Sequence, residues 1–385
     1  KWARLYAGPE KAFSSHSNLP DPDRKLRIGY LSPDFREHSA AYFFEPLLEG
    51  HSREDFEIYG YGSVAVPDSF TERITAKFDS YRNIYDIADE QAAEMIKGDK
   101  IDILVDLAGH SAGGRLAVLA FKPAPVCVSY LAINTTAMTA VDYRLTDVYS
   151  NPSGSERYYT EQLVYLPGIH LCYRPAWFAP PAGPLPAAKN GFVTFGSFNN
   201  HLKIHSDVIA VWSQILKRVK GSRLFFKFGA AEDENVQDYY RSKFIAEGAD
   251  PDRIIFCGRR DTKEHLSLYG NIDIALDTWP FNGCTTTCEA MWMGVPVVSR
   301  IGDAFVSRAA LSLLARVGLR GFVSESGPEY IEKAVELAGN LQALDYLRRT
   351  MRARMACSGL CCSREFAGNV EAAYRGMWKK WCDQQ

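Results

Sequence analysis

The sequence has no apolar run that approaches the roughly 18 residues needed to cross a membrane. It also lacks a strong excess of charge, because its formal net charge is only −2. We therefore expect no membrane span and no nucleic-acid partner held by general electrostatic attraction. The first ten residues, KWARLYAGPE, do not have the pattern of a signal peptide and resemble the end of a segment that continues upstream. These features favour a cytoplasmic protein, or a nuclear one in a eukaryote.

The nine cysteines do not form the even set that is typical of a disulfide framework. Several lie in apolar segments, namely Cys127, Cys172, Cys257 and Cys288. This distribution favours reduced thiols, as in proteins of the cytosol.

A metal site is not expected either. The cluster Cys357, Cys361 and Cys362 lacks the second cysteine pair and the nearby histidine that a zinc site would need. The triplets Asp21-Pro-Asp23 and Asp250-Pro-Asp252 each centre on a proline in a polar stretch, which is more typical of turns or helix starts than of metal ligands. We therefore predict that the protein needs neither a metal nor another cofactor.

What the sequence does contain is a regular alternation of apolar strands and amphipathic helices, in 385 residues of which 46% are hydrophobic. The predicted strands are 26–32, 56–63, 101–108 and 126–132 in the first half, and 191–199, 223–229, 253–258, 272–278 and 295–299 in the second. The predicted helices are 41–50, 69–78, 89–97, 114–121, 205–219, 237–247, 263–270 and 307–317. Near-continuous apolar strands indicate parallel sheets covered on both faces. The predicted fold class is α/β, with two doubly wound, Rossmann-like lobes.

A stretch rich in proline and alanine at 175–190 separates the halves and is interpreted as a linker. We expect a lead-in segment at 1–24, an N-terminal lobe at 25–174, and a C-terminal lobe at 191–385 that ends in helices. The last of these helices, 366–381, carries an apolar stripe that should pack on the body of the protein. Two lobes joined by one linker imply a cleft, with ligands at the carboxyl ends of strands.

The stretch from Asn282 to Met293, NGCTTTCEAMWM, carries the clearest functional signal. It lies between two predicted strands, so it should contain a turn and then a short helix. Thr285, Thr286 and Thr287 fall where that helix begins, and a helix N-terminus offers unpaired N–H groups to phosphate. Glu289 lies one turn further on, at a reach suited to ribose hydroxyls. A simple threonine cap is the alternative, but the whole pattern favours a nucleotide-diphosphate site.

Other candidate residues follow the predicted strands of the first half. His38 stands at the entry to a helix, where a neutral imidazole could act as a base or a hydrogen-bond partner, or merely bond the backbone. Gly109 and His110 begin a glycine-rich loop that could let backbone approach a ligand closely. The alternative for this loop is a tight turn between a strand and a helix.

Two candidates follow strands of the second half. Lys203 is the permanently basic side chain immediately beyond strand 191–199, from which it could reach a diphosphate as a point charge. His265 lies beyond strand 253–258 and could stack on a nucleobase. A solvated loop lysine and a surface histidine in a first helical turn are the corresponding alternatives.

With these residues in view, the chain resembles the catalytic region of the protein O-linked N-acetylglucosamine transferases, including their plant Spindly branch and bacterial relatives. The resemblance runs from about Leu26 to Trp381. It is carried by IGYLSPDFREHS, IDILVDLAGHSAG, VTFGSFNNHLKI, ALDTWPFNGCTTTCEAMWMGVPVV, SLLARVGL and AYRGMWKKW. It implies a GT-B fold and an inverting, metal-independent glycosyltransferase that moves N-acetylglucosamine from UDP-N-acetylglucosamine (UDP-GlcNAc) to Ser or Thr hydroxyls of proteins.

The resemblance also implies roles at the diphosphate. Lys203 would neutralise the donor diphosphate, Thr285 and Thr286 would hold its oxygens at the helix start, and Thr287 would add a backbone N–H. An inverting transfer needs an acceptor hydroxyl in line with the anomeric carbon and charge stabilisation on the leaving diphosphate. A cation and a helix terminus can supply that stabilisation without a metal.

Further roles concern the rest of the donor and the acceptor. By the same resemblance, Glu289 would bind the ribose, His265 would lie against the base, and Asn200 would line the same pocket. His38 would lie beside the sugar and the acceptor. His38 and Lys203 are therefore the expected catalytic residues, and Gly109 and His110 are expected to border the cleft.

Three features depart from the family pattern. The segment 130–138 lacks the Gly-Tyr-Pro turn that the family usually has beside the cleft. Thr262 stands where animal enzymes carry a lysine near the base, with Lys263 next to it, which is more similar to the Spindly or bacterial branches. Neither upstream tetratricopeptide repeats nor a domain inserted between the lobes is in this sequence, and the repeats are expected in the full-length protein.

Three alternative functions stay open. GDP-fucose could be the donor, as in the Spindly branch, because the phosphate and ribose contacts would be shared. A sugar-nucleotide sensor without turnover would keep the donor site, and the altered 130–138 loop is the feature that favours it. A small-molecule sugar-nucleotide enzyme, such as an epimerase, would share the two-lobed fold but would not explain the GHSAG and FNNHLKI matches.

Overall fold

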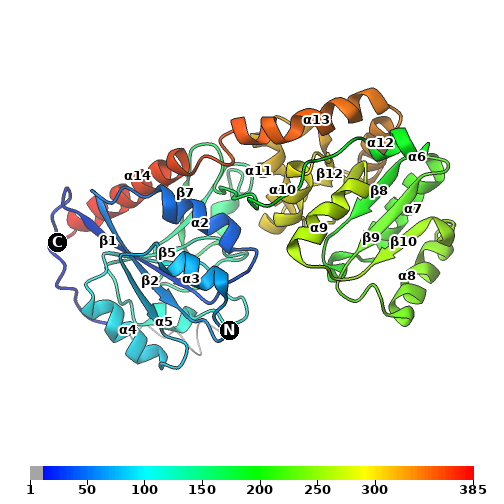
Figure 1. Ribbon diagram of the computed structural model, residues 1–385. Helices are drawn as coiled ribbons and strands as arrows, with labels where there is room; N and C mark the ends of the chain where they lie inside the picture. Colours follow the sequence, from blue (N-terminus) through cyan, green and yellow to red (C-terminus); the bar gives the residue numbers. More distant parts are fainter. Residues whose placement is uncertain (1–11) are drawn as a thin grey trace. The chain divides into compact units, whose positions relative to one another are not determined.

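The computed structural model of the chain describes residues 12–385. It divides into two compact units, Lys1–Arg174 together with Cys362–Gln385, and Pro175–Cys361 (Figure 1). Residues 1–11 of the predicted lead-in segment lie outside the described residues. Within 12–385, no helix is long and apolar enough to cross a membrane.

The first unit is built on a parallel seven-stranded sheet with the order β3-β2-β1-β4-β5-β6-β7. Its strands are β1 (Leu26–Ser32), β2 (Phe56–Gly62), β3 (Ser80–Asn83), β4 (Ile103–Asp106), β5 (Val126–Ser129), β6 (Tyr143–Thr146) and β7 (Gln162–Tyr165). Its helices are α2 (Ala41–Gly50), α3 (Ser69–Thr75), α4 (Asp89–Gly98), α5 (Leu116–Ala120), α14 (Ser363–Cys382) and the 3-10 helix η2 (Ser155–Tyr158). Leu31 of β1 pairs with Tyr61 of β2 and with Asp106 of β4, so the carboxyl ends of these three strands lie together.

Both faces of this sheet are buried, and alternate residues of a strand serve opposite faces. On β4, Ile103 and Val105 belong to the core that includes residues of α2 and α14. Leu104 belongs to the core that includes residues of α4 and α5. Burial on both faces explains why the strands are continuously apolar, as the sequence predicted for a doubly wound parallel sheet.

The second unit is built on a parallel six-stranded sheet with the order β10-β9-β8-β11-β12-β13. Its strands are β8 (Thr194–Ser197), β9 (Arg223–Lys227), β10 (Ile254–Cys257), β11 (Ile274–Leu276), β12 (Val297–Arg300) and β13 (Val323–Ser324). Its α-helices are α6 (Pro186–Asn190), α7 (Ser206–Arg218), α8 (Glu234–Ala246), α9 (Thr262–Leu268), α10 (Thr285–Trp292), α11 (Ala309–Arg316), α12 (Gly327–Ala338) and α13 (Leu341–Cys357). Its 3-10 helices are η3 (His201–Lys203), η4 (Pro251–Arg253), η5 (Tyr269–Asn271), η6 (Phe305–Ser307) and η7 (Arg320–Phe322). Together, the two sheets confirm the predicted α/β class.

The final helix corrects the predicted domain boundary, because residues 362–385 belong to the first unit and not to the C-terminal lobe. The apolar stripe of α14 supplies Val370, Tyr374 and Met377 to the first core. Helix α14 lies against α2, where a Cβ on Gly50 would come within 2.3 Å of Ser363 O (Figure 1). An apolar stripe indicates that one face of a helix packs against a core, but it does not identify which of the two sheets forms that core.

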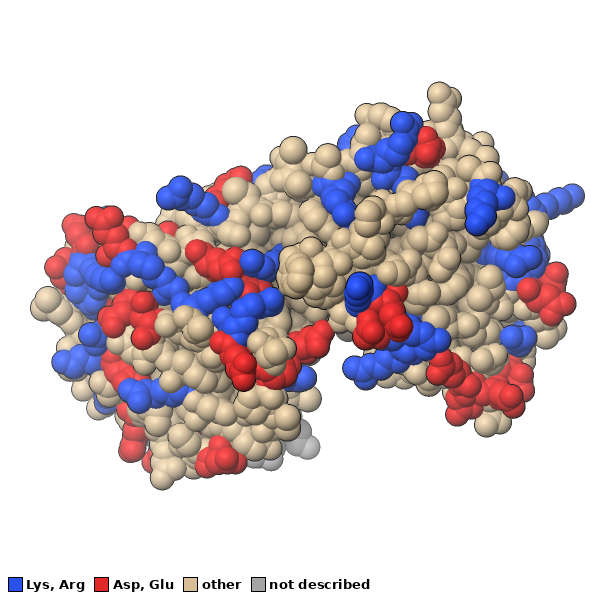
Figure 2. Space-filling model, viewed as in Figure 1, with Lys and Arg blue, Asp and Glu red and all other residues tan. Residues whose placement is uncertain are grey.

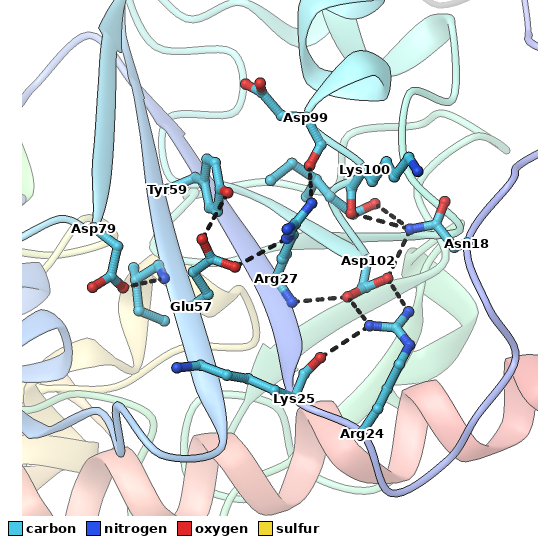
Figure 3. A network of polar contacts seen from close by, with 12 residues as sticks. Asn18, Arg24, Lys25, Arg27, Glu57, Tyr59, Asp79, Asp99, Lys100 and Asp102 are labelled. Atoms are coloured by element: carbon cyan, nitrogen blue, oxygen red, sulfur yellow. Dashed lines mark hydrogen bonds and ion pairs between the residues drawn. The ribbon is translucent and has the colours of Figure 1, made fainter.

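The lead-in segment is tied to the first sheet at the amino ends of its strands. The tie is the buried carboxylate of Asp102, which directly precedes β4 (Figure 3). Asp102 Oδ1 accepts from Asn18 Nδ2 at 2.7 Å, and Oδ2 accepts from Arg24 Nη1 at 2.8 Å. Oδ2 also accepts from the backbone N–H of Arg27 at 2.8 Å. Since ligands bind at the carboxyl ends of strands, this network at the amino ends is structural.

The predicted linker 175–190 is held against the second unit and ends in α6. Ala187 N donates to Asp273 Oδ1 at 2.8 Å. Arg348 of α13 donates to Ala182 O at 2.9 Å and to Gly183 O at 3.3 Å. The segment is therefore a packed part of this unit.

On the face that Figure 2 shows, acidic and basic side chains are interspersed, in keeping with the small net charge.

Candidate functional site

The turn after β11 is organised by the carboxylate of Asp277, which is 1% exposed. Oδ1 accepts from the backbone N–H groups of Thr278 at 2.8 Å and Gly283 at 2.6 Å, and Oδ2 accepts from Ser299 Oγ at 2.6 Å. A Cβ on Gly283 would lie 2.6 Å from Thr286 Oγ1, so glycine permits this close approach. Burial raises the pKa of Asp277 to about 6. The carboxylate thus fixes the entry to α10.

Helix α10 begins at Thr285, where the sequence predicted a helix start. Its N-cap residue, Cys284, makes no side-chain capping bond. Thr286 Oγ1 donates to Asn199 Oδ1 at 3.1 Å, and Thr287 Oγ1 donates to Gly283 O at 3.1 Å. Because the N-cap side chain does not use them, the N–H groups of the first turn remain as donors for an anion.

Lys203 lies beside this turn. Its Nζ donates to Asn282 O at 2.9 Å and lies 3.9 Å from the centroid of the Phe281 ring. Burial lowers the pKa of Lys203, while the nearby Asp277 raises it. An ammonium carries three N–H groups, so the bond to Asn282 leaves two of them for a ligand at the start of α10.

The two asparagines after β8 have different positions. Asn200, which was predicted to line the pocket, is exposed, and its Oδ1 accepts from Leu202 N at 3.0 Å as the cap of η3. Asn199 is buried and contacts Thr286 Oγ1 and, at 3.4 Å, Asp277 Oδ1. Sequence reasoning did not single out Asn199, although its place at the end of a buried strand was the available signal.

His265 and Glu289 come together as part of a polar chain. His265 Nε2 lies 2.9 Å from Glu289 Oε2, and Tyr269 Oη lies 3.5 Å from the same oxygen. Lys227, the last residue of β9, places Nζ 2.7 Å from His265 Nδ1. Sequence reasoning also missed Lys227. It is the last residue of β9 (RLFFK), which was recognised only as a strand, from its apolar residues.

Some of these residues line one pocket of the second unit, whereas Lys203, Lys227, His265 and Glu289 lie outside its lining. The pocket lies at the carboxyl ends of β8 and β11, which is the predicted location in a doubly wound sheet. Its polar lining includes Ser197, Asn199, Tyr269, Asp277, Thr286 and Thr287. The pocket therefore joins the Asp277 turn, the start of α10 and the tyrosine that contacts Glu289.

The first unit carries His38, between β1 and α2. His38 Nδ1 lies 3.3 Å from Asp34 Oδ2 and 3.3 Å from the backbone N of Ala40. One nitrogen cannot both donate to the carboxylate and accept from the N–H group. The N–H group of Ala40 makes this hydrogen bond, so Nδ1 is the acceptor, and Asp34 Oδ2 is a close ionic neighbour of the ring. Burial lowers the pKa of His38, so the ring is neutral and, with Nδ1 accepting, carries its proton on Nε2.

The glycine-rich loop after β4 contains Gly109 and His110. Gly109 has φ +57°, and a Cβ there would lie 2.7 Å from the Ala132 Cβ. Gly109 N donates to Asp106 Oδ2 at 2.7 Å. His110 Nε2 lies 3.1 Å from Thr136 O and must donate, because a carbonyl only accepts. The loop is thus fixed against the segment 130–138.

The segment 130–138, which departs from the family pattern, is held by two charged side chains. Arg144 Nη1 donates to Asn134 O at 2.8 Å, and Nη2 donates to Ala132 O. Glu161 accepts from Thr136 N at 2.5 Å and from Thr135 Oγ1 at 2.6 Å. The altered sequence therefore keeps a defined conformation in this unit.

Metal ligands do not gather in the described part of the chain, because residues 12–385 contain no group of three or more His, Cys, Asp or Glu side chains placed to hold an ion. As predicted, the two Asp-Pro-Asp triplets belong to a bend and a helix start, because Asp250 caps the 3-10 helix η4 and Asp21 lies in a loop. Asp21 Oδ1 accepts from Asp23 N, and Asp250 Oδ1 accepts from Asp252 N, both at 3.0 Å.

Comparisons with known proteins point to one family. The model of glycosyl transferase family 41 matches residues 7–173 and 186–370. A Petunia hybrida protein, named as a probable UDP-N-acetylglucosamine–peptide N-acetylglucosaminyltransferase SPINDLY, is 39% identical over 100% of this chain. The chain spans only 41% of the length of that relative.

Solved structures give the same result for the fold. A mutant of the O-GlcNAc transferase of Thermobaculum terrenum matches with a TM-score of 0.94 and 37% identity, over 100% of this chain and 73% of that one. HepE of Anabaena, in complex with UDP and glucose, matches with a TM-score of 0.56 and 11% identity, over 90% of this chain and 99% of that one. The second likeness shows the fold alone, and together they confirm the predicted GT-B class. Since the family match covers both units, this chain belongs to glycosyl transferase family 41.

Proposed function

We propose that the chain transfers N-acetylglucosamine from UDP-GlcNAc to Ser or Thr hydroxyls of proteins, with inversion and without a metal. The observation that carries the proposal is that Lys203 lies against the turn that leads into the uncapped N-terminus of α10. A cation and a helix terminus are the two features that bind a diphosphate most readily. Membership of a glycosyltransferase family supports the same donor class.

The chemistry requires negative charge to be stabilised on the diphosphate as the glycosidic bond breaks. Lys203 supplies a positive charge in a partly buried setting, where Coulomb interactions are stronger than in water. The N–H groups at the start of α10 add fixed dipoles. Glu289 would accept from the ribose hydroxyls, and His265 would lie against the base.

The acceptor hydroxyl must lose a proton as it attacks the anomeric carbon. In the proposal His38 lies beside the sugar and acceptor. Its Nε2 can take that proton in the tautomer whose Nδ1–H faces Asp34, and with Nδ1 bonded to the Ala40 N–H group its Nε2–H is a hydrogen-bond donor to the same groups. A lowered pKa keeps the imidazole neutral near pH 7, which is the form that a base or hydrogen-bond acceptor needs. Upstream repeats would help to hold protein acceptors.

GDP-fucose is the second candidate donor, because none of the phosphate and ribose contacts distinguishes the two nucleotides. Thr262 is the first residue of α9 and stands one turn before His265. A lysine here would bring a charge towards the base, so the threonine leaves the identity of the base open. A binding protein without turnover is the third candidate.

The test offers the purified chain UDP-GlcNAc, GDP-fucose and other nucleotide sugars with a Ser/Thr peptide acceptor and detects products by mass. Parallel reactions contain EDTA, and NMR of the product gives the configuration at the anomeric carbon. A β-linked N-acetylglucosamine product formed in EDTA supports the proposal. A fucosyl product, retention of configuration, a metal requirement, or tight nucleotide binding without any product would each contradict it.

A further inference from the structure

Lys227, His265 and Glu289 form a chain of contacts that the proposed chemistry does not yet use. Lys227 Nζ is 2.7 Å from His265 Nδ1, and His265 Nε2 is 2.9 Å from Glu289 Oε2. The three residues come from β9, α9 and α10, so they meet only in the folded unit. All three lie in the second unit, which makes the chain of contacts independent of the first.

The donors and acceptors in this chain can be assigned. An ammonium has three N–H donors and no acceptor, so His265 Nδ1 must accept from Lys227. A neutral imidazole with an accepting Nδ1 carries its proton on Nε2. Nε2–H then donates to Glu289, whose ionised carboxylate only accepts.

We infer that Lys227 is a positioning residue for the nucleotide: its ammonium holds His265 in the neutral form with the proton on Nε2, and that ring in turn orients the carboxylate of Glu289. The inference rests on the proposed nucleotide site and adds to it the group that sets its hydrogen bonding. Lys227 does not itself need to touch the nucleotide.

The surroundings act on the charge of Lys227 and on the position of the ring. Burial lowers the pKa of Lys227 overall, and the carboxylate of Glu289 opposes that shift and favours the ammonium. Cys257 also raises that pKa, and Arg259 and Arg260 lower it. The His265 ring packs 5.5 Å from both Phe198 and Tyr269, measured between ring centroids. Packing therefore sets the ring position, and Lys227 sets its proton.

The consequence for the ligand lies at Glu289. Within the described residues, His265 donates to Oε2. The Tyr269 hydroxyl lies 3.5 Å from the same oxygen but shares its single proton with Thr286 O at 3.3 Å. Oε1 is then available to accept from ribose hydroxyls, with the carboxylate held mainly by His265. If His265 carried its proton on Nδ1 instead, Nε2 and Oε2 would be two acceptors facing each other at 2.9 Å, and the carboxylate would turn away.

The first arm of the test is NMR of the chain with ¹⁵N-labelled histidine. The chain has eight histidines, and His265→Gln identifies the signal of interest. We expect wild-type His265 with Nε2 protonated and Nδ1 bare. Lys227→Met should change this pattern, while Lys227→Arg, which also only donates, should restore it. Lys220→Met, at an exposed lysine of the same unit, is the control. A wild-type ring protonated on Nδ1, or an unchanged pattern in Lys227→Met, would overturn the inference.

The second arm measures binding of UDP and GDP by calorimetry, with inorganic pyrophosphate as a competitor. Lys227→Met should weaken both nucleotides about 2- to 30-fold, the range of a coupled residue outside the contact shell. Pyrophosphate binding should not change, because pyrophosphate has no ribose or base. Equal losses for pyrophosphate and nucleotide would make Lys227 a phosphate cation or a folding residue and overturn its positioning role.

The two arms separate the inference from the proposed function. If wild-type chain binds neither nucleotide, the proposed donor site fails, and the NMR arm still decides the role of Lys227 at His265. If Lys227→Met does not fold, the wild-type spectrum and the Lys227→Arg variant carry the decision. The expected Lys227→Arg result is near wild-type nucleotide affinity, and a loss as large as that of Lys227→Met would contradict the inference.

Discussion

Thr286 Oγ1 donates to Asn199 Oδ1 at 3.1 Å, across 87 residues of sequence. The amide orientation of Asn199 follows from its other neighbour, since Nδ2 lies 3.4 Å from Asp277 Oδ1 and a carboxylate can only accept. The threonine hydroxyl must therefore be the donor to Asn199. This bond joins the end of β8 to the start of α10 and uses the hydroxyl proton that a phosphate would otherwise receive.

The first prediction follows from that bond. Thr286→Val removes the donor and leaves Asn199 Oδ1 buried without a partner, which costs about 1–3 kcal/mol of stability. Thr285→Val is the matched control. Thr285 is the neighbouring residue at the helix start and, like Thr286, is half-buried, whereas Thr287 is buried. Urea unfolding of the two variants compares the costs. Equal stability in both would mean that the bond to Asn199 contributes nothing.

The second prediction concerns the diphosphate. Lys203→Ala should weaken UDP binding about 10- to 150-fold, which corresponds to the loss of a charge-assisted contact of about 1.5–3 kcal/mol. Transfer should be nearly abolished while the fold stays intact. Calorimetry with UDP measures the loss, and Lys220→Ala provides a control at an exposed lysine of the same unit. Unchanged affinity in Lys203→Ala would remove this residue from the site.

Much of the fold could be predicted from the sequence, because burial on both faces makes a parallel strand continuously apolar. Strand 26–32 has the predicted bounds, and the start of α10 falls on the predicted threonines. Short or polar strands gave no such signal. The edge strand β3 (Ser80–Asn83) is only partly buried, β6 (YRLT) carries the charged Arg144, and β7 (QLVY) begins with the exposed Gln162.

The site was only partly predictable, for a related physical reason. Turn chemistry and a helix start are local features, so the Asn282–Met293 stretch could be recognised from its own residues. The bonds of Asn199 and Lys227 join segments far apart in the sequence, and a strand's end residue can point to either face. The same limit explains α14, whose apolar stripe fits any open sheet face until the sheets are built.

The third prediction concerns pH. Unfolded Asp277 ionises near 3.8, while burial raises its pKa in the folded chain to about 6. Between these values the folded state binds more protons, so the stability contributed at low pH is lost as pH rises through about 6. The difference corresponds to roughly 3 kcal/mol.

Asp277→Asn keeps an acceptor for Thr278 N and Gly283 N but does not titrate. The stability of the wild type relative to this variant should therefore fall between pH 4 and pH 7, measured by urea unfolding at each pH. Asp106, whose pKa is also raised to about 6, is present in both proteins and cancels. Asp252→Asn, at an exposed carboxylate, is the control. A pH-independent difference would show that Asp277 keeps its proton, or its charge, throughout.

The fourth prediction concerns His38. His38→Ala should lower turnover far more than it lowers UDP affinity, because the proposal puts His38 beside the sugar and acceptor and not at the diphosphate. Asp34→Asn should have a smaller effect of the same kind, since it removes the carboxylate that lies 3.3 Å from Nδ1. Kinetics with a peptide acceptor and calorimetry with UDP give the two quantities. Equal losses in both would make His38 a donor-binding or structural residue.

The fifth prediction concerns Arg348, which is 2% exposed and joins three segments of the second unit. Beyond the linker carbonyls of Ala182 and Gly183, its guanidinium donates to Ile272 O at 2.9 Å and Tyr269 O at 3.1 Å. Arg348→Met fills similar space but leaves these carbonyls without their donor. We expect a loss of about 2–4 kcal/mol, because each buried orphan acceptor costs about 1–3 kcal/mol and removal of a buried charge offsets part of it.

The next residue on α13 offers a matched control. Arg349 has a side chain that is 69% exposed and pairs with Asp345, so Arg349→Met should change stability by less than about 1 kcal/mol. Hydrogen exchange adds a local measurement. In Arg348→Met, the backbone of the 175–190 segment and of η5 should exchange faster, while β1 and α14 of the first unit should keep wild-type rates. If both variants lose equal stability, or if exchange rises equally in both units, Arg348 does not hold the linker in place through these carbonyls.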